Sequence, residues 1–200
     1  MAKVHQIVKY INDSLMEGVF SDKRFSGSGV YGIATQVPRA IDSEGHYDIV
    51  MPIIDESGNT VLDDAFYNQN EPMRIFHRII SSGYSPDQPA SFGSNMESKR
   101  TIGMGMVIFA DKKRVQINAE DLDLMAHIEM PRIVPKSMMQ AGYGQMSISH
   151  QQTELNQVIL FGQLFRKYDF TLEPQVVLLE LKYSIEYTAT AACIKSLCCN

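Results

Sequence analysis

The sequence predicts an α+β fold, with helices packed on one side of a mainly antiparallel sheet. Near the N-terminus an apolar stripe recurs at helical spacing, at Val4, Ile7, Val8, Ile11 and Leu15. Near the C-terminus, residues 177–187 alternate apolar and polar side chains, as expected of a long strand with one packed face. The full order is helix, several strands, helix, helix, strand, which is typical of helices gathered beside an antiparallel sheet.

The first third of the chain is expected to form one helix and a β-hairpin. The helix covers residues 3–17 and ends at Gly18. Alternating side chains then predict a strand at 31–37, whose end at Pro38 must be an edge or a bend, and a second strand at 47–53. The intervening "DSEG" supplies the turn between these two strands.

The stretch "PMRIFHRIISSG" at residues 72–83 fits two structures. Pro72 and Gly83 suit the two ends of a helix, whereas the isoleucine-rich content favours a strand, which is the interpretation we prefer. The polar segment 83–100 is then expected to be a long loop. Loops of this length inside a compact domain usually serve a function or are disordered.

The segment "RTIGMGMVIFADKKRVQI" at residues 100–117 alternates between the two faces of a predicted strand. One face carries Ile102, Met104, Met106 and Ile108, and the other carries Gly103, Gly105, Val107 and Phe109. "ADKK" is expected to make a tight turn, after which Val115 and Ile117 return as a short strand. The basic side chains of Lys112, Lys113 and Arg114 would then lie at an exposed hairpin tip.

A helix is predicted to begin at Asn118, whose side-chain oxygen can accept a hydrogen bond from the backbone N–H of Asp121. Pro131 ends this helix. A second short helix is expected over about 153–167, before the long final strand.

The domain organisation follows from these elements. We find no internal repeat and no clear linker, so residues 1–200 are expected to form a single domain. Two extended loops, at 83–100 and 131–150, would project from it.

Composition and charge limit the classes of function. The net charge is -5 and the pI is about 5.5, which argues against a general polyanion binder. No run of 18 apolar residues is present, so no membrane span is expected. The three cysteines, Cys193, Cys198 and Cys199, gather at the end of the chain and form no disulfide framework, which suggests synthesis in a reducing cytoplasm.

Known catalytic and cofactor patterns are missing from the sequence. The five histidines are scattered, and neither a Gly-x-Ser-x-Gly elbow nor a P-loop occurs. We therefore expect no enzyme activity, no metal and no cofactor. One alternative stays open, in which Gly103, Gly105 and the Lys112–Arg114 run hold a nucleotide or phosphate. In a third hypothesis the same basic tip contacts DNA.

Two segments resemble parts of tailed-bacteriophage neck and tail-completion proteins. In "MVIFADKKRVQINAEDLDLMAHIEMP" an apolar strand leads to a basic turn and then to a helix that has an acidic start and ends near a proline. In "FRKYDFTLEPQVVLLELKYSIEY" an aspartate-aromatic turn leads into a long amphipathic final strand. The pattern is similar to that of ring-forming connector and tail-barrel proteins of short-tailed phages, including crAss-like phages.

This resemblance implies a structural role in the virion. The chain would form a closed ring in the head-to-tail connector or tail barrel, made in the host cytoplasm, and would support the channel through which the genome passes. Its partners would be copies of itself, the portal and neighbouring neck or tail proteins, with DNA passing transiently and no membrane contact. The candidate subunit-interface residues lie in the two long loops: Tyr84, Phe92, Met96, Met138, Met139 and Tyr143.

Overall fold

The computed structural model of the chain describes residues 2–38, 47–54, 60–64, 70–86, 97–130, 146–157, 159–160 and 175–190. It confirms the α+β class. The elements, in chain order, are α1 (Ala2–Glu17), the 3₁₀ turn η1 (Lys23–Phe25), β1 (Gly29–Ile33), β2 (Thr35–Pro38), β3 (Tyr47–Ile54), β4 (Thr60–Asp64), β5 (Met73–Pro86), β6 (Glu97–Asp111), α2 (Lys112–Val115), α3 (Ala119–Glu129), β7 (Met146–Glu154) and β8 (Val176–Thr190).

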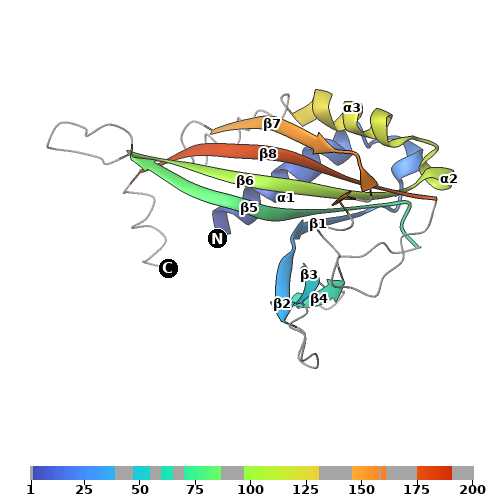
Figure 1. The fold of residues 1–200 in the computed structure, drawn as a ribbon, viewed down its shortest axis with the longest axis horizontal. Coiled ribbons are helices and arrows are strands. Elements are labelled where there is room, and N and C mark those ends of the chain that lie inside the picture. Colours follow the sequence, from blue (N-terminus) through green and yellow to red (C-terminus); the bar gives the residue numbers. More distant parts are fainter. Residues whose placement is uncertain are drawn as a thin grey trace, which may run out of the picture.

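A five-stranded sheet forms the centre of the molecule, in the order β1-β5-β6-β8-β7 (Figure 1). Every neighbouring pair is antiparallel except β1 and β5, which run parallel. A second sheet of three strands, β2-β3-β4, is antiparallel throughout. The sheet is therefore mainly antiparallel, as the sequence predicts.

The predicted strand 31–37 divides between the two sheets. Residues 29–33 belong to β1 and residues 35–38 to β2, which forms the expected antiparallel hairpin with β3. Between them the N–H of Ala34 donates to the carbonyl of His77 at 2.7 Å. An alternating sequence pattern does not show that a strand passes from one sheet to another, because alternation indicates only which side of the chain is packed.

The main core lies between the sheet and its helices. The predicted α1 stripe is buried against the methionine- and isoleucine-rich face of β6 and the odd-numbered face of β8, and α3 adds Leu122 and Ala126 to the same cluster. α1 and α3 therefore cover the same face of the sheet, which confirms the prediction of helices on one side. Among the described residues, no helix is long and apolar enough to cross a membrane.

The segment 83–100 is not simply a loop, which corrects the sequence prediction at both of its ends. β5 continues to Pro86 and β6 begins at Glu97, and the two strands stay paired up to Pro86 and Ser98. The turn and polar residues there suggested a loop, but cross-strand pairing extends the hairpin. Residues 87–96 lie outside the described part of the chain.

The length of the final strand is matched by that of its neighbours in the sheet. β8 has 15 residues and pairs with β6 along its whole length, so it does not project alone. Strands of this length span about 50 Å, whereas the 16 residues of α1 span about 24 Å. β5, β6 and β8 therefore extend together past the helix that covers them (Figure 1).

The basic run at 112–114 does not form a hairpin tip, and the return strand at 115–117 is absent. Lys112–Val115 form one helical turn, in which the Asp111 carboxylate accepts hydrogen bonds from the N–H groups of Lys113 and Arg114. Gln116 ends the turn with a left-handed backbone, φ 52°. An aspartate before three basic residues can belong to a turn or can cap the start of a helix. In the structure, Asp111 caps a helical turn.

The helix that starts at Asn118 is confirmed, with the Asn118 side chain accepting from the Asp121 N–H at 2.7 Å.

The predicted boundary between the 131–150 loop and the 153–167 helix is wrong. Residues 146–154 form strand β7, which the sequence analysis assigned to the end of the 131–150 loop and the start of a helix. The helical turn begins only at Asn156, whose side chain accepts from the Ile159 N–H. The polar sequence of β7 hides it, because an edge strand needs few apolar residues.

Candidate functional site

The two glycines of β6 lie on the sheet face opposite α1. Their neighbours Met104 and Met106 point into the helix-covered core, so Gly103 and Gly105 point away from it. β6 is paired with a strand on each side, and its backbone groups therefore belong to the sheet ladders. Gly105 and Lys112 are seven positions apart along an extended chain, which corresponds to about 23 Å. The geometry does not join the glycines and the basic run into one phosphate site.

An ion pair lies over Gly105. Arg78 of β5 and Glu180 of β8 meet across β6, with Nε–Oε1 at 2.5 Å and Nη2–Oε2 at 3.0 Å. The Glu180 side chain is 0% exposed and that of Arg78 is 32% exposed. A Cβ atom at Gly105 would lie 2.1 Å from Glu180 Oε1. The glycine therefore makes room for a buried, two-bonded salt bridge.

Alanine substitutions at three strand glycines should show whether Gly105 is needed to make room for the salt bridge or only for the backbone freedom of a glycine. Gly105→Ala is expected to destabilise the fold by about 1–3 kcal/mol, because the methyl group overlaps a buried carboxylate. Gly103→Ala should cost less, since its neighbour is the rotatable hydroxyl of exposed Ser81. Gly32→Ala is the control, because nothing lies within 4 Å of its added Cβ. Urea unfolding of the three variants measures the series, and equal effects at all three positions would contradict it.

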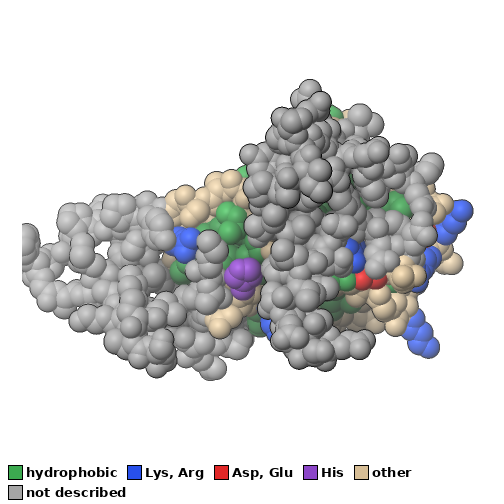
Figure 2. Space-filling model, turned by 90° about the horizontal axis from the view of Figure 1, so that it is seen from below, with side chains coloured by type: hydrophobic (Ala, Val, Ile, Leu, Met, Phe, Trp, Pro, Cys, Tyr) green, Lys and Arg blue, Asp and Glu red, His purple; other side chains and the backbone are tan. Residues whose placement is uncertain are grey.

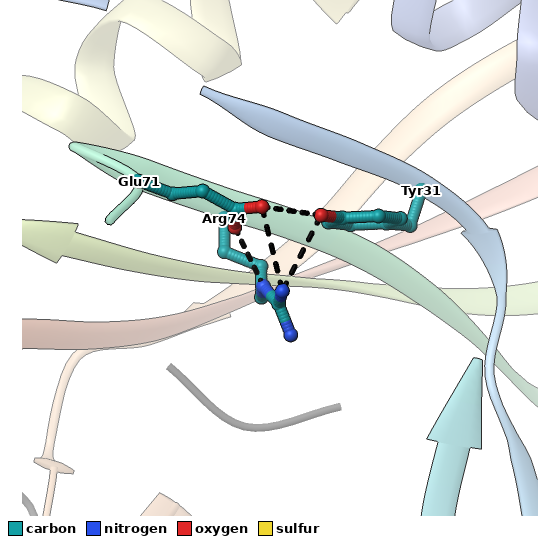
Figure 3. Close-up of polar contacts among 3 residues, drawn as sticks. All are labelled: Tyr31, Glu71 and Arg74. Atoms are coloured by element: carbon teal, nitrogen blue, oxygen red, sulfur yellow. Dashed lines mark hydrogen bonds and ion pairs between the residues drawn. The ribbon is translucent and has the colours of Figure 1, made fainter. Parts of the chain in front are cut away.

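A second polar cluster lies on the same sheet face, next to β1 (Figure 3). The Glu71 carboxylate accepts from Arg74 Nε at 2.7 Å and from the Tyr31 hydroxyl. The Arg74 guanidinium also lies over the Tyr31 ring, 4.8 Å from its centroid. Burial, together with Glu71 as acceptor, raises the pKa of Tyr31 to about 12. The phenol therefore stays protonated, and the cluster joins β1 to β5 rather than offering a reactive group.

A buried hydrogen-bond network connects α1 to the sheet. The Asn12 amide donates to the Tyr31 carbonyl at 2.8 Å, so the Asn12 oxygen accepts from His77 Nε2 at 2.7 Å. His77 Nδ1 then accepts from the Tyr183 hydroxyl at 2.8 Å. Burial lowers the pKa of His77 to about 3 and raises that of Tyr183. The side chains of this network satisfy one another with a neutral imidazole, which identifies the network as structural.

The exposed apolar residues define two surfaces. In the described part of the chain, the strongly exposed large apolar side chains are Ile79, Ile80, Leu124, Ile128, Leu155 and Ile159. We call the first two the β5-edge patch and the other four the α3–β7 patch. Leu124 and Ile128 are one turn apart on α3, and Leu155 and Ile159 follow β7 directly. A hydrogen bond from Thr153 to Asp123 holds the end of β7 beside α3.

The two patches lie on opposite edges of the five-stranded sheet. β5 is on one side of the strand order and β7 closes the other, with α3 beside it (Figure 1). β1 pairs with β5 only as far as His77. Among the described residues, the outer edge of β5 from Arg78 to Pro86 therefore has no strand partner. An open strand edge with exposed isoleucines is a surface on which another chain can pair.

The residues expected at a subunit interface are largely beyond what the structure describes. Phe92, Met96, Met138, Met139 and Tyr143 lie outside the described residues, as do Cys193, Cys198 and Cys199. Of Tyr84 the structure places only the backbone, in β5 opposite Arg100. Lys112, Lys113 and Arg114 are exposed, as expected, although on a helical turn.

Sequence reasoning missed the polar clusters. Glu180 alternates with the apolar residues of a strand predicted to have one packed face, yet it is fully buried. Arg78 and Glu180 are 102 residues apart, and only the strand register shows that they meet. Glycines among large residues in a strand, at 103 and 105, indicate that another backbone or a large side chain approaches that sheet face, but they do not identify it as Glu180.

No protein-family model matches the sequence, and no curated protein matches it. Within the described residues, no group of three or more His, Cys, Asp or Glu side chains could hold a metal ion.

Proposed function

We propose that the chain is a non-enzymatic structural protein of a virion, which assembles head to tail with copies of itself into a closed ring. The ring would belong to the head-to-tail connector or tail barrel of a tailed phage and would support the channel for genome passage. Its other partners would be the portal and the adjoining neck or tail proteins. The observation that carries the proposal is the pair of exposed apolar patches on opposite edges of one sheet.

Two different patches on opposite sides favour a ring over a two-fold dimer. A two-fold contact joins the same surface on both copies, whereas a contact between unlike surfaces leaves one of each open at the ends. Such a contact closes into a ring when the rotation between copies allows it. The β5-edge patch would meet the α3–β7 patch of the next copy. The edge of β5 that has no strand partner among the described residues would add main-chain hydrogen bonds.

The resemblance to neck and tail-completion proteins also supports the proposal, with one departure. The long amphipathic final strand fits their pattern. The segment after β6 departs from it, because residues 112–115 form a helical turn and not a hairpin. The resemblance therefore supports the arrangement of strands and helices. It gives no information on the contact surfaces, which need a direct test.

Ile80→Lys should abolish ring formation without unfolding the chain. Ile80 is 45% exposed, so a lysine there is solvated in the monomer, with an effect on stability within about 0.5 kcal/mol. In the ring the same charge would be buried at an apolar contact, which is unfavourable. Native mass spectrometry and electron microscopy, with portal and neck proteins present as templates, measure assembly.

The matched control is Lys9→Ala, which removes an exposed charge on α1 outside both patches. It should assemble like the wild type. A wild-type chain that stays monomeric alone and with every such template would contradict the proposal, and so would an Ile80→Lys variant that forms normal rings.

A further inference from the structure

A basic surface at one end of the sheet is built by two segments that lie far apart in the sequence. η1 follows α1, α2 follows β6, and the two one-turn elements lie side by side. Each is anchored in the common core by one buried side chain, Phe25 in η1 and Val115 in α2. Figure 2 shows Lys and Arg side chains gathered at the end of the molecule where α2 lies in Figure 1. The five cations of this surface are Lys23, Arg24, Lys112, Lys113 and Arg114.

The backbone under these cations is fixed by two aspartate caps. Asp22 accepts from the Arg24 N–H at 2.9 Å and Asp111 accepts from the Lys113 N–H at 2.8 Å. The pKa of Asp22 is lowered by the hydrogen bonds that its carboxylate accepts, first from the backbone N–H of Arg24 and then from the Arg24 side chain. Both carboxylates therefore hold the turns in place while the lysine side chains point into solvent.

The lysines carry the charge available to a partner. Among the described residues, the structure records no ion pair for Lys23, Lys112 or Lys113, whereas Arg24 pairs with Asp22. Two exposed acidic residues, Glu120 and Asp121, begin α3 a few positions further on. They reduce the net positive charge of this end, so we expect binding that is weak and strongly dependent on salt.

The exposed side chains at this end favour nucleic acid over a protein partner. Protein interfaces have an apolar core, and every strongly exposed large apolar side chain of the described residues lies in the β5-edge or α3–β7 patch instead. Lysine ammonium groups act as point charges that suit phosphates, and contacts with phosphates carry no sequence information. A set of exposed lysines on a fixed backbone is therefore suited to follow a DNA backbone.

We propose that the surface formed by η1 and α2 contacts the phosphate backbone of double-stranded DNA, without reading its sequence. This role rests on the proposed function, in which a genome passes through the ring. It assigns the DNA contact to a surface whose residues are distinct from those of the two patches that join the copies.

Fluorescence anisotropy with a labelled DNA duplex, over a series of salt concentrations, tests this proposal. The affinity should fall with salt, and the double variant Lys112→Ala/Lys113→Ala should lower the slope of log affinity against log salt by about 1.8, or about 0.9 for each phosphate that is no longer neutralised. Lys23→Ala should lower it by about 0.9. Lys9→Ala removes the same charge from α1 and should leave the slope unchanged.

The outcomes separate this proposal from the proposed function. An unchanged slope in the double variant, or no binding of DNA at low salt, overturns the proposal. Preferential binding of polyglutamate over DNA also overturns it and assigns the surface to an acidic protein. Native mass spectrometry of the same samples, alone and with portal and neck proteins added as templates, measures assembly independently. Rings that form without DNA binding refute only this inference, and DNA binding by a chain that never assembles refutes only the proposed function.

Discussion

Arg78→Ala is expected to lower the free energy of unfolding by about 3–5 kcal/mol, the range for breaking a buried ion pair. The reason is that Glu180 is 0% exposed and would lose both of its bonds to the guanidinium. Because Arg78 itself is 32% exposed, water can reach the vacated space, so the lower end of the range is expected. Urea or thermal unfolding followed by circular dichroism measures the loss.

Two further variants show whether the loss comes from the unpaired carboxylate. Arg78→Met/Glu180→Met replaces the pair by apolar side chains and should recover much of the stability, because no buried charge is left. Lys9→Ala breaks the exposed pair with Asp13 and should change stability by less than about 1 kcal/mol. A double variant as unstable as Arg78→Ala would show that packing, and not the charge, is responsible.

Acidification should destabilise the chain through His77. Its pKa is about 3 in the folded state and 6.5 when exposed, so between these values the unfolded chain binds a proton that the folded chain does not. The contribution to stability is complete above pH 6.5 and is lost as the pH falls. The free energy of unfolding that is lost between pH 7 and pH 5 is about 2 kcal/mol, because each pH unit well below 6.5 costs 1.36 kcal/mol.

His77→Gln isolates this contribution. A glutamine amide can donate to Asn12 and accept from Tyr183, so the buried network keeps its hydrogen bonds without a titrating group. The variant should lose about 2 kcal/mol less than the wild type between pH 7 and pH 5. His5→Gln removes an exposed histidine of α1 and should keep the wild-type pH dependence. Identical pH profiles for wild type and His77→Gln would refute the assignment.

Local patterns predicted the elements that bury one continuous face. The α1 stripe, the Asn118 cap and the final strand were predicted correctly, because each is specified by residues close in sequence. The extension of β5 and β6 into 83–100 was missed, since their ends are polar and are held by pairing with other strands. The strand β7 was missed for the same reason.

The candidate surfaces depend even more on distant contacts. The exposure of Lys112–Arg114 could be predicted from their charge, but their position beside Lys23 and Arg24 could not, because packing of η1 on α2 brings them together. The two apolar patches likewise required the strand order, which places β5 and β7 at opposite edges. The Arg78–Glu180 pair required the register across three strands.

The most direct test of the ring is a mixing experiment between two variants. Ile80→Lys disables the β5-edge patch, and Leu124→Lys disables the α3–β7 patch at a residue that is 55% exposed. Each variant keeps one intact patch that has no partner in its own solution. Native mass spectrometry, under conditions in which the wild type forms rings, should find each variant monomeric alone. The equimolar mixture should contain a dimer with one copy of each variant and nothing larger. Variants that form rings alone, or a mixture that stays monomeric, would contradict head-to-tail assembly through these two edges.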